Sequence, residues 1–68
     1  MEIKLKIDGM SCHHCSARVQ SFLESQEGLS DVLVDLDRKK AGFSCNEDQD
    51  VEVIVQGINA LGYKAVQD

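Results

Sequence analysis

The sequence predicts an α+β fold in which a four-stranded antiparallel sheet is covered on one face by two helices. Four short segments have the residue pattern of strands, and two segments between them repeat apolar residues at helical spacing. The resulting order is strand, helix, strand, strand, helix, strand, which is the ferredoxin-like βαββαβ arrangement. The 68 residues contain one such unit without an internal repeat, so we expect a single domain over residues 1–68.

The first half of the chain is expected to supply a strand, a helix and a second strand. Residues 2–7 alternate strictly between apolar and polar side chains, which is typical of a half-buried strand. After a loop, apolar residues from Cys15 to Leu23 recur at helical spacing, and Gly28 is expected to end this helix. Residues 31–37 alternate again and predict the second strand.

The second half is expected to supply two more strands and a helix. Residues 38–40 are basic and predict an exposed turn, and residues 41–45 place apolar side chains on one face of a third strand. Asp50 is a candidate N-cap for a helix over residues 51–61, which the following glycine ends. Residues 63–66 then predict a short last strand.

Composition excludes several classes of function. The chain has 12 acidic and 7 basic residues, and its net charge of −5 argues against nucleic acid or an anionic membrane as the main partner. The longest apolar stretch is only a few residues, so no membrane insertion is expected. The first residues carry alternating charges instead of the apolar core of a signal sequence, so we expect a cytoplasmic protein. The acidic surface is either simply solvated or a docking face for a basic partner.

Two cysteines, Cys12 and Cys15, lie between the first strand and the first helix and are the most informative feature. A helix N-terminus favours thiolate, and two thiolates three residues apart bind a soft metal or perform redox chemistry. The chain lacks the length, tryptophan and proline of a thioredoxin, and it has no second cysteine or histidine pair to complete a tetrahedral zinc site. Metal binding is therefore favoured, and Cu(I) best suits two soft ligands.

The run Gly-Met-Ser-Cys-His-His-Cys at 9–15, followed by Gly62 and Tyr63, resembles the heavy-metal-associated domain family, especially its free-standing bacterial copper chaperones. The resemblance covers essentially the whole chain. It implies a carrier, not an enzyme, that binds Cu(I) and passes it by ligand exchange to a copper-transporting P-type ATPase. Cys12 and Cys15 match the metal ligands of the family. A copper-responsive regulator is an alternative partner, and two copies bridged by copper through their loops are a further possibility.

The resemblance also implies roles for residues near the loop. Met10 is expected to tuck under the loop as a core residue instead of binding metal, and Tyr63 is expected to shield the site without touching the ion. Gly9 is expected to adopt a backbone conformation that other residues resist. His13 and His14 are either solvent-facing residues that tune thiol acidity or ligands in a metal-bridged dimer.

Three more residues and two alternative functions complete these expectations. Arg18 and Lys64 are candidates to flank the site and offset the negative charge of a copper bis-thiolate. Cys45 is expected to be a small buried residue away from the loop and not a third ligand, with redox or dimer chemistry left open. The alternatives are a carrier of zinc, cadmium or mercury, with Ser11 weighing against zinc because similar zinc domains tend to have Asp there, and a dithiol redox protein.

Overall fold

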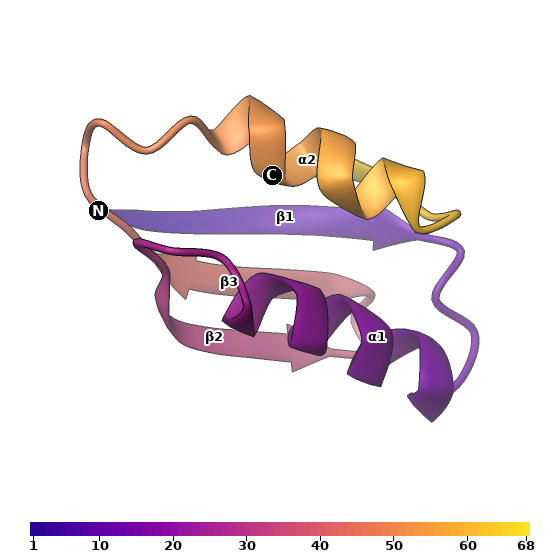
Figure 1. Cartoon of the computed structure of the whole chain (residues 1–68). Helices are drawn as coiled ribbons and strands as arrows, with labels where there is room; N and C mark the ends of the chain where they lie inside the picture. The colour runs from indigo at the N-terminus through magenta and orange to yellow at the C-terminus, as the bar shows by residue number, and fades with distance from the viewer.

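A computed structural model describes all 68 residues and confirms the ferredoxin-like order. Its elements are β1 (Glu2–Asp8), α1 (His13–Glu24), β2 (Ser30–Asp35), β3 (Lys40–Ser44), α2 (Val51–Ala60) and β4 (Lys64–Gln67). The strands form one antiparallel sheet in the order β2-β3-β1-β4, and both helices pack on the same face of it (Figure 1). The opposite face of the sheet carries no helix.

The strand β1 is the centre of the sheet because it pairs with β3 on one side and β4 on the other. Its alternation holds throughout: Ile3, Leu5 and Ile7 are buried under the helices, whereas the residues between them are exposed. Successive side chains of a strand point to opposite faces, so this pattern alone fixes which face meets the helices. The end of β1 therefore leads the chain to the loop of the two cysteines at a defined edge of the sheet.

The second helix begins where the sequence predicts, whereas the first begins at His13, two residues before its apolar pattern, and its expected end is wrong. The helix α1 ends at Glu24, four residues before Gly28, because polar side chains form hydrogen bonds with a backbone carbonyl of its last turn. The hydroxyl of Ser25 and the side-chain amide of Gln26 both donate to the Phe22 carbonyl, at 2.7 and 3.3 Å. Gly28, at φ +85°, instead forms the turn into β2.

The second helix keeps its predicted cap. The carboxylate of Asp50 accepts the backbone N–H of Glu52 at 3.1 Å, which satisfies one of the free donors of the first turn. The helix ends at Ala60, one residue earlier than expected. The side-chain oxygen of Asn59 then accepts the backbone N–H of Ala65 at 2.8 Å, which ties the end of α2 to β4.

The strand boundaries differ from the expected ones by one or two residues. The strand β2 spans Ser30–Asp35, with an irregular register between Ser30 and Leu33, where Asp31 has φ +53°. The turn to β3 lies one residue earlier than expected, because Lys39 takes the left-handed conformation at φ +57° and Lys40 already pairs in the sheet. The last strand starts at Lys64 instead of residue 63.

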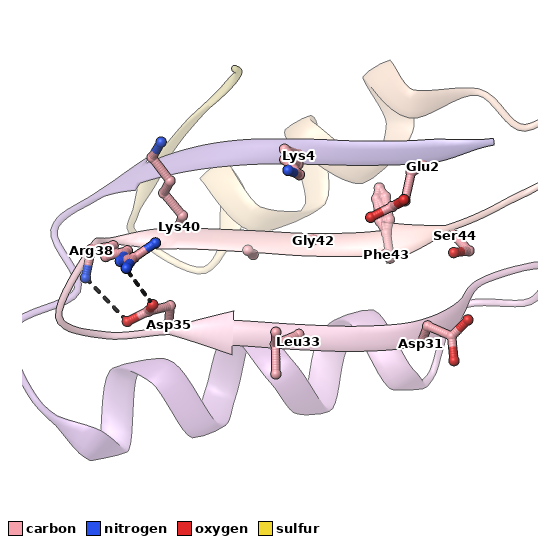
Figure 2. Close-up of a pocket in the computed structure, with 11 residues that line it drawn as sticks. Glu2, Lys4, Asp31, Leu33, Asp35, Arg38, Lys40, Gly42, Phe43 and Ser44 are labelled. Carbon is pink, nitrogen blue, oxygen red and sulfur yellow. Dashed lines mark hydrogen bonds and ion pairs between the residues drawn. The ribbon is translucent and has the colours of Figure 1, made fainter.

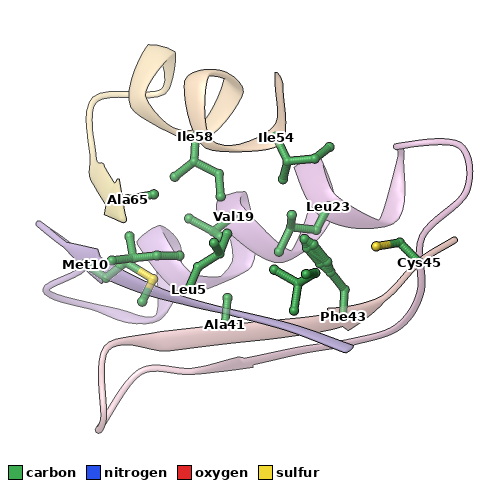
Figure 3. Close-up of a cluster of buried hydrophobic side chains, with 12 residues drawn as sticks. Leu5, Met10, Val19, Leu23, Ala41, Phe43, Cys45, Ile54, Ile58 and Ala65 are labelled. Carbon is green, nitrogen blue, oxygen red and sulfur yellow. The ribbon is translucent and has the colours of Figure 1, made fainter. Parts of the chain in front are cut away.

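The core lies between the sheet and the two helices. Met10 lies at one end of this cluster and Cys45 at the other (Figure 3). No helix in the structure is long and apolar enough to span a membrane. The twelve buried side chains are all apolar or cysteine: Ile3, Leu5, Ile7, Met10, Val19, Leu23, Ala41, Phe43, Cys45, Ile54, Ile58 and Ala65.

Candidate metal-binding loop

The loop between β1 and α1 is shaped by one glycine and anchored by one methionine. Gly9 has φ +99°, a conformation that side chains with a Cβ rarely adopt, and a Cβ there would also lie 3.5 Å from the Tyr63 ring. Met10 is 1% exposed and fills the core directly below the loop, as expected. The next two residues are therefore held at the surface above a packed base.

The two thiols of the loop lie side by side in different surroundings. Cys12 is exposed at the N-cap of α1, whereas Cys15 is half-buried in the first turn and packs against the core. The Cys12 thiol donates a hydrogen bond to the sulfur of Cys15, with 3.7 Å between the two Sγ atoms. Both cysteines are free, so the structure presents two adjacent sulfur donors at an open helix start.

The electrostatics of the loop favour thiolate at Cys15. The Tyr63 hydroxyl, by donating to the thiolate form, is the main reason why the pKa of the Cys15 thiol is lowered to about 7, from an ordinary 9.0. The backbone of Ser11 and both the side chain and the backbone of Cys12 lower the pKa further, and partial burial opposes them. The same interaction raises the pKa of the Tyr63 hydroxyl, because donating to the Cys15 sulfur stabilises the protonated phenol, and partial burial raises this pKa further. Near pH 7 about half of the Cys15 side chains are thus thiolate.

The tyrosine is held from two sides. One edge of its ring lies against Gly9, and the guanidinium of Arg18 lies 5.9 Å from the ring centroid, within the range of a cation–π interaction. Arg18 therefore flanks the site, as expected from the sequence. Lys64 is exposed on β4 and faces Asp8 of β1 in the register of the sheet. The guanidinium of Arg18 thus places a positive charge beside Tyr63, the residue that lowers the pKa of Cys15.

The other candidate residues lie apart from the two sulfurs. His13 and His14 are exposed in the first turn of α1, and no hydrogen bond of either imidazole is seen. Cys45 is 7% exposed at the far end of the core, where its backbone exchanges two hydrogen bonds with Met1. No group of three or more His, Cys, Asp or Glu side chains could hold a metal ion. The two adjacent sulfur atoms at the loop are those of Cys12 and Cys15.

The effect of Tyr63 on the pKa of Cys15 is not predicted from the sequence, where the helix terminus and the histidines are the expected causes of thiol acidity. Forty-eight positions separate the two residues, so no local pattern links them. The only sequence signal is the placement of the tyrosine directly after Gly62, whose φ of +106° turns the chain back toward the loop. The largest contribution to the lowered pKa of Cys15 therefore comes from a residue that is distant in the sequence.

Comparison with known proteins places the chain in a family. The copper chaperone CopZ of Enterococcus hirae is 36% identical over 66 residues, covering 96% of this chain and 96% of that protein. A solved structure described as CopZ metallochaperone superposes with a TM-score of 0.88 at 27% identity, covering 97% of this chain and all of that one.

Parts of longer proteins are similar too. A probable copper-exporting P-type ATPase of Archaeoglobus fulgidus is 39% identical over 94% of this chain, which corresponds to 8% of the ATPase. A mercuric reductase of Staphylococcus aureus is 41% identical over 90% of this chain, which corresponds to 11% of the reductase. Residues 4–64 match the family described as heavy-metal-associated domain. This chain belongs to the heavy-metal-associated domain family.

Proposed function

We propose that this chain is a cytoplasmic Cu(I) metallochaperone that delivers its ion to the metal-binding domain of a copper-transporting P-type ATPase. The observation that carries the proposal is the pair of free thiols, 3.7 Å apart, at the exposed start of α1. Soft thiolate ligands favour Cu(I), which accepts a low coordination number. The protein acts as a carrier and not as an enzyme.

The two sulfurs need little movement to hold one ion. Two metal–thiolate bonds of about 2.3 Å span about 4.6 Å when they are collinear, so the sulfurs separate by about 1 Å from their 3.7 Å spacing. Cys12 is exposed and its side chain makes no hydrogen bond other than the one to Cys15, so rotation of this side chain supplies the movement. The core below the loop stays packed around Met10.

Transfer proceeds by exchange of thiolate ligands. An incoming cysteine thiolate of the acceptor forms a bond to the ion, and the bond from the ion to Cys12 then breaks. Cys12 leaves as a thiolate and takes a proton from water. Cys15 leaves last because its side chain is half-buried and packs against the core, whereas Cys12 is exposed to the incoming thiolate. The exposed sulfur is thus the point of exchange and the half-buried sulfur is the anchor.

The family relationship supports an ATPase as the acceptor. A segment of a probable copper-exporting ATPase is similar to this chain over nearly its whole length, so we propose as the acceptor a domain of similar fold with its own metal loop. Two such loops offer the same kind of ligand, which allows exchange with a small difference in affinity. A copper-responsive regulator with an exposed cysteine pair is the alternative acceptor.

The identity of the metal is tested by competition. The reduced chain is titrated with Cu(I), Zn(II) and Hg(II) against a chromogenic chelator, and native mass spectrometry gives the stoichiometry. We expect one Cu(I) per chain that zinc does not displace, and loss of tight binding in Cys12→Ser and in Cys15→Ser. Cys45→Ala is the matched control, because this buried thiol lies at the far end of the core and its loss leaves the stoichiometry unchanged.

Three outcomes would contradict the proposal. Preferential binding of Hg(II) would favour mercury handling, a possibility supported by the similarity to part of a mercuric reductase. Preferential binding of Zn(II) or Cd(II) would favour a divalent-metal carrier. If none of these metals binds tightly and the thiol pair reduces a disulfide substrate with turnover, the chain is a dithiol redox protein. Transfer itself is measured by mixing the loaded chain with an apo ATPase metal-binding domain and separating the two proteins.

A further inference from the structure

Arg18 lies one turn after Cys15 on the same face of α1, because residues three apart are neighbours on a helix. Long side chains of a helix lean toward its N-terminus, which directs Arg18 toward the cysteine loop. Its guanidinium lies 5.9 Å from the centroid of the Tyr63 ring, within the range of a cation–π interaction. The helix thus places this cation against a ring from the last part of the chain.

The guanidinium of Arg18 has no carboxylate partner. The two ion pairs of the chain involve other residues: Arg38 pairs with Asp35 at 3.7 Å (Figure 2), and Lys40 pairs with Asp68 at 2.9 Å. The positions three and four residues before and after Arg18 hold histidine, cysteine, serine and phenylalanine, so no acid of α1 competes for it. In a chain with 12 acidic residues, this exposed cation therefore lies against an aromatic ring instead of an acid.

The ring of Tyr63 depends on such a neighbour. Tyr63 is half-buried and packs against the core, but on the loop side its ring lies against Gly9, which has no side chain to hold it. Partly exposed side chains change rotamer rapidly unless neighbours restrain them. Arg18 supplies this restraint from the helix side. The position of the ring is thus set by the core, a glycine and one arginine.

The ring lies beside one of the two sulfurs. Tyr63 lowers the pKa of Cys15 more than any other group does, and Cys15 is in turn the largest cause of the raised pKa of Tyr63. The two side chains also pack against the same core cluster. Cys15 is half-buried, whereas Cys12 is exposed. The ring is therefore placed to cover Cys15 and to leave Cys12 open.

We propose that Arg18 is a positioning residue that holds the Tyr63 ring beside Cys15 and thereby shields this sulfur, so that ligand exchange begins at Cys12. The order of exchange rests on the proposed function, whereas the shielding is a property of the metal-free chain. While the ring is held, an incoming thiolate bonds to the ion and the bond from the ion to Cys12 breaks, and Cys15 stays bound. A cation–π contact at an exposed site is weak, so its loss should change rates about two- to fivefold.

The test compares two neutral alkylating reagents on the reduced, metal-free chain: iodoacetamide and its bulkier N-benzyl derivative. In both, the thiolate forms a bond to the same carbon and iodide leaves, so the ratio of the two rates cancels the thiolate fraction and reports access to the sulfur. Conversion is kept low, and fragment masses assign each modification to Cys12 or Cys15. In Arg18→Ala the ratio of bulky to small reagent should rise about two- to fivefold at Cys15 and stay unchanged at Cys12.

Charge variants and spectroscopy separate the role of Arg18 from simple packing. Arg18→Lys keeps a cation and should retain most of the shielding, whereas Arg18→Gln should behave like Arg18→Ala. Tyr63 is the only tyrosine and the chain has no tryptophan, so the tyrosine band in near-ultraviolet circular dichroism reports the order of this ring alone. The band should weaken in Arg18→Ala and persist in Arg18→Lys. Arg38→Ala is the matched control, because this arginine pairs with Asp35 at the turn between β2 and β3, and it should alter neither readout.

The proposal is overturned if Arg18→Ala leaves the rate ratio at Cys15 and the tyrosine band unchanged, or if Arg18→Gln shields Cys15 as well as the original arginine does. Far-ultraviolet circular dichroism verifies the fold of each variant. In the copper-loaded chain, Arg18→Ala should release Cu(I) to a bulky chelator about two- to fivefold faster with little change in affinity, and an unchanged rate would overturn the role of Arg18 in exchange. Absence of tight Cu(I) binding in the original chain would instead refute the proposed function and leave the shielding result standing.

Discussion

Replacing Tyr63 with Phe removes one oxygen atom and tests how the site acidifies its anchor thiol. The ring keeps its place against Gly9 and under Arg18, so the change deletes the hydroxyl that hydrogen-bonds Cys15 and little else. Because that bond is the largest of the contributions that lower the pKa of Cys15, the pKa should rise from about 7 toward the ordinary 9.0.

The magnitude follows from the two pKa values. At pH 7 a thiol with a pKa of about 7 is half ionised, whereas one with a pKa of 9.0 is ionised to about 1%. The substitution should therefore lower the thiolate fraction of Cys15 at pH 7 several-fold, with about fifty-fold as the limit. Alkylation of Cys15 at that pH should slow accordingly, since the thiolate is the reactive form.

The assay is the pH dependence of alkylation at Cys15, followed by peptide mass spectrometry on the reduced, metal-free chain. His13→Gln and His14→Gln are the controls, because they remove the imidazoles beside the thiols and leave Tyr63 in place. The midpoint should stay near 7 in both controls and rise in Tyr63→Phe. A midpoint that stays near 7 in Tyr63→Phe, with a rise in either histidine variant, would refute the role of the tyrosine.

Three further predictions concern stability, measured by denaturant unfolding of the reduced apo-protein. In Gly57→Ala the new Cβ overlaps the ring of Phe22, so overpacking of about 1–3 kcal/mol should outweigh a helix-propensity gain of about 1 kcal/mol, and the variant should be less stable. In a Phe22→Ala background the same substitution should increase stability. Equal changes in the free energy of unfolding in both backgrounds would exclude the clash with Phe22. Asp50→Ala should cost about 1 kcal/mol through loss of the α2 cap, and Asp50→Ser should recover most of it. The pKa of Asp68 is lowered by Lys40, so this pair should contribute stability above the unfolded pKa of 3.8 that is lost as the pH falls below it. Asp68→Asn should remove that part of the acid dependence, and an unchanged pH profile would show that the pair contributes nothing.

The fold was predictable because apolar residues recur in each strand and helix at the spacing typical of that element. The strict alternation of β1 determines its buried face, and the helical spacing of α2 follows a capping aspartate. The end of α1 was not predictable from its glycine, because Ser25 satisfies the terminal carbonyl of Phe22 before Gly28 is reached. Competing side-chain caps of this kind leave the apolar pattern unchanged.

The candidate site was only partly predictable, for a similar reason. Cys12 and Cys15 are close in sequence, so a helix start is enough to bring their sulfurs together. The contact of Tyr63 with Cys15 depends on how β4 returns along β1, which is a property of the whole sheet.

In the proposed function the carrier must hold its ion firmly and still release it, and the two cysteines would divide these requirements between them. Binding strength comes from two thiolates, whereas the rate of release depends on how easily one of them leaves. If both sulfurs had the same surroundings, their bonds to the ion would break at the same rate. Here the core and Tyr63 restrain Cys15, while Cys12 stands outside any packing. If Tyr63 is the cause of this inequality, Tyr63→Phe should change the rate of transfer more than the affinity for the ion. Equal changes in both would mean that the tyrosine contributes only to binding.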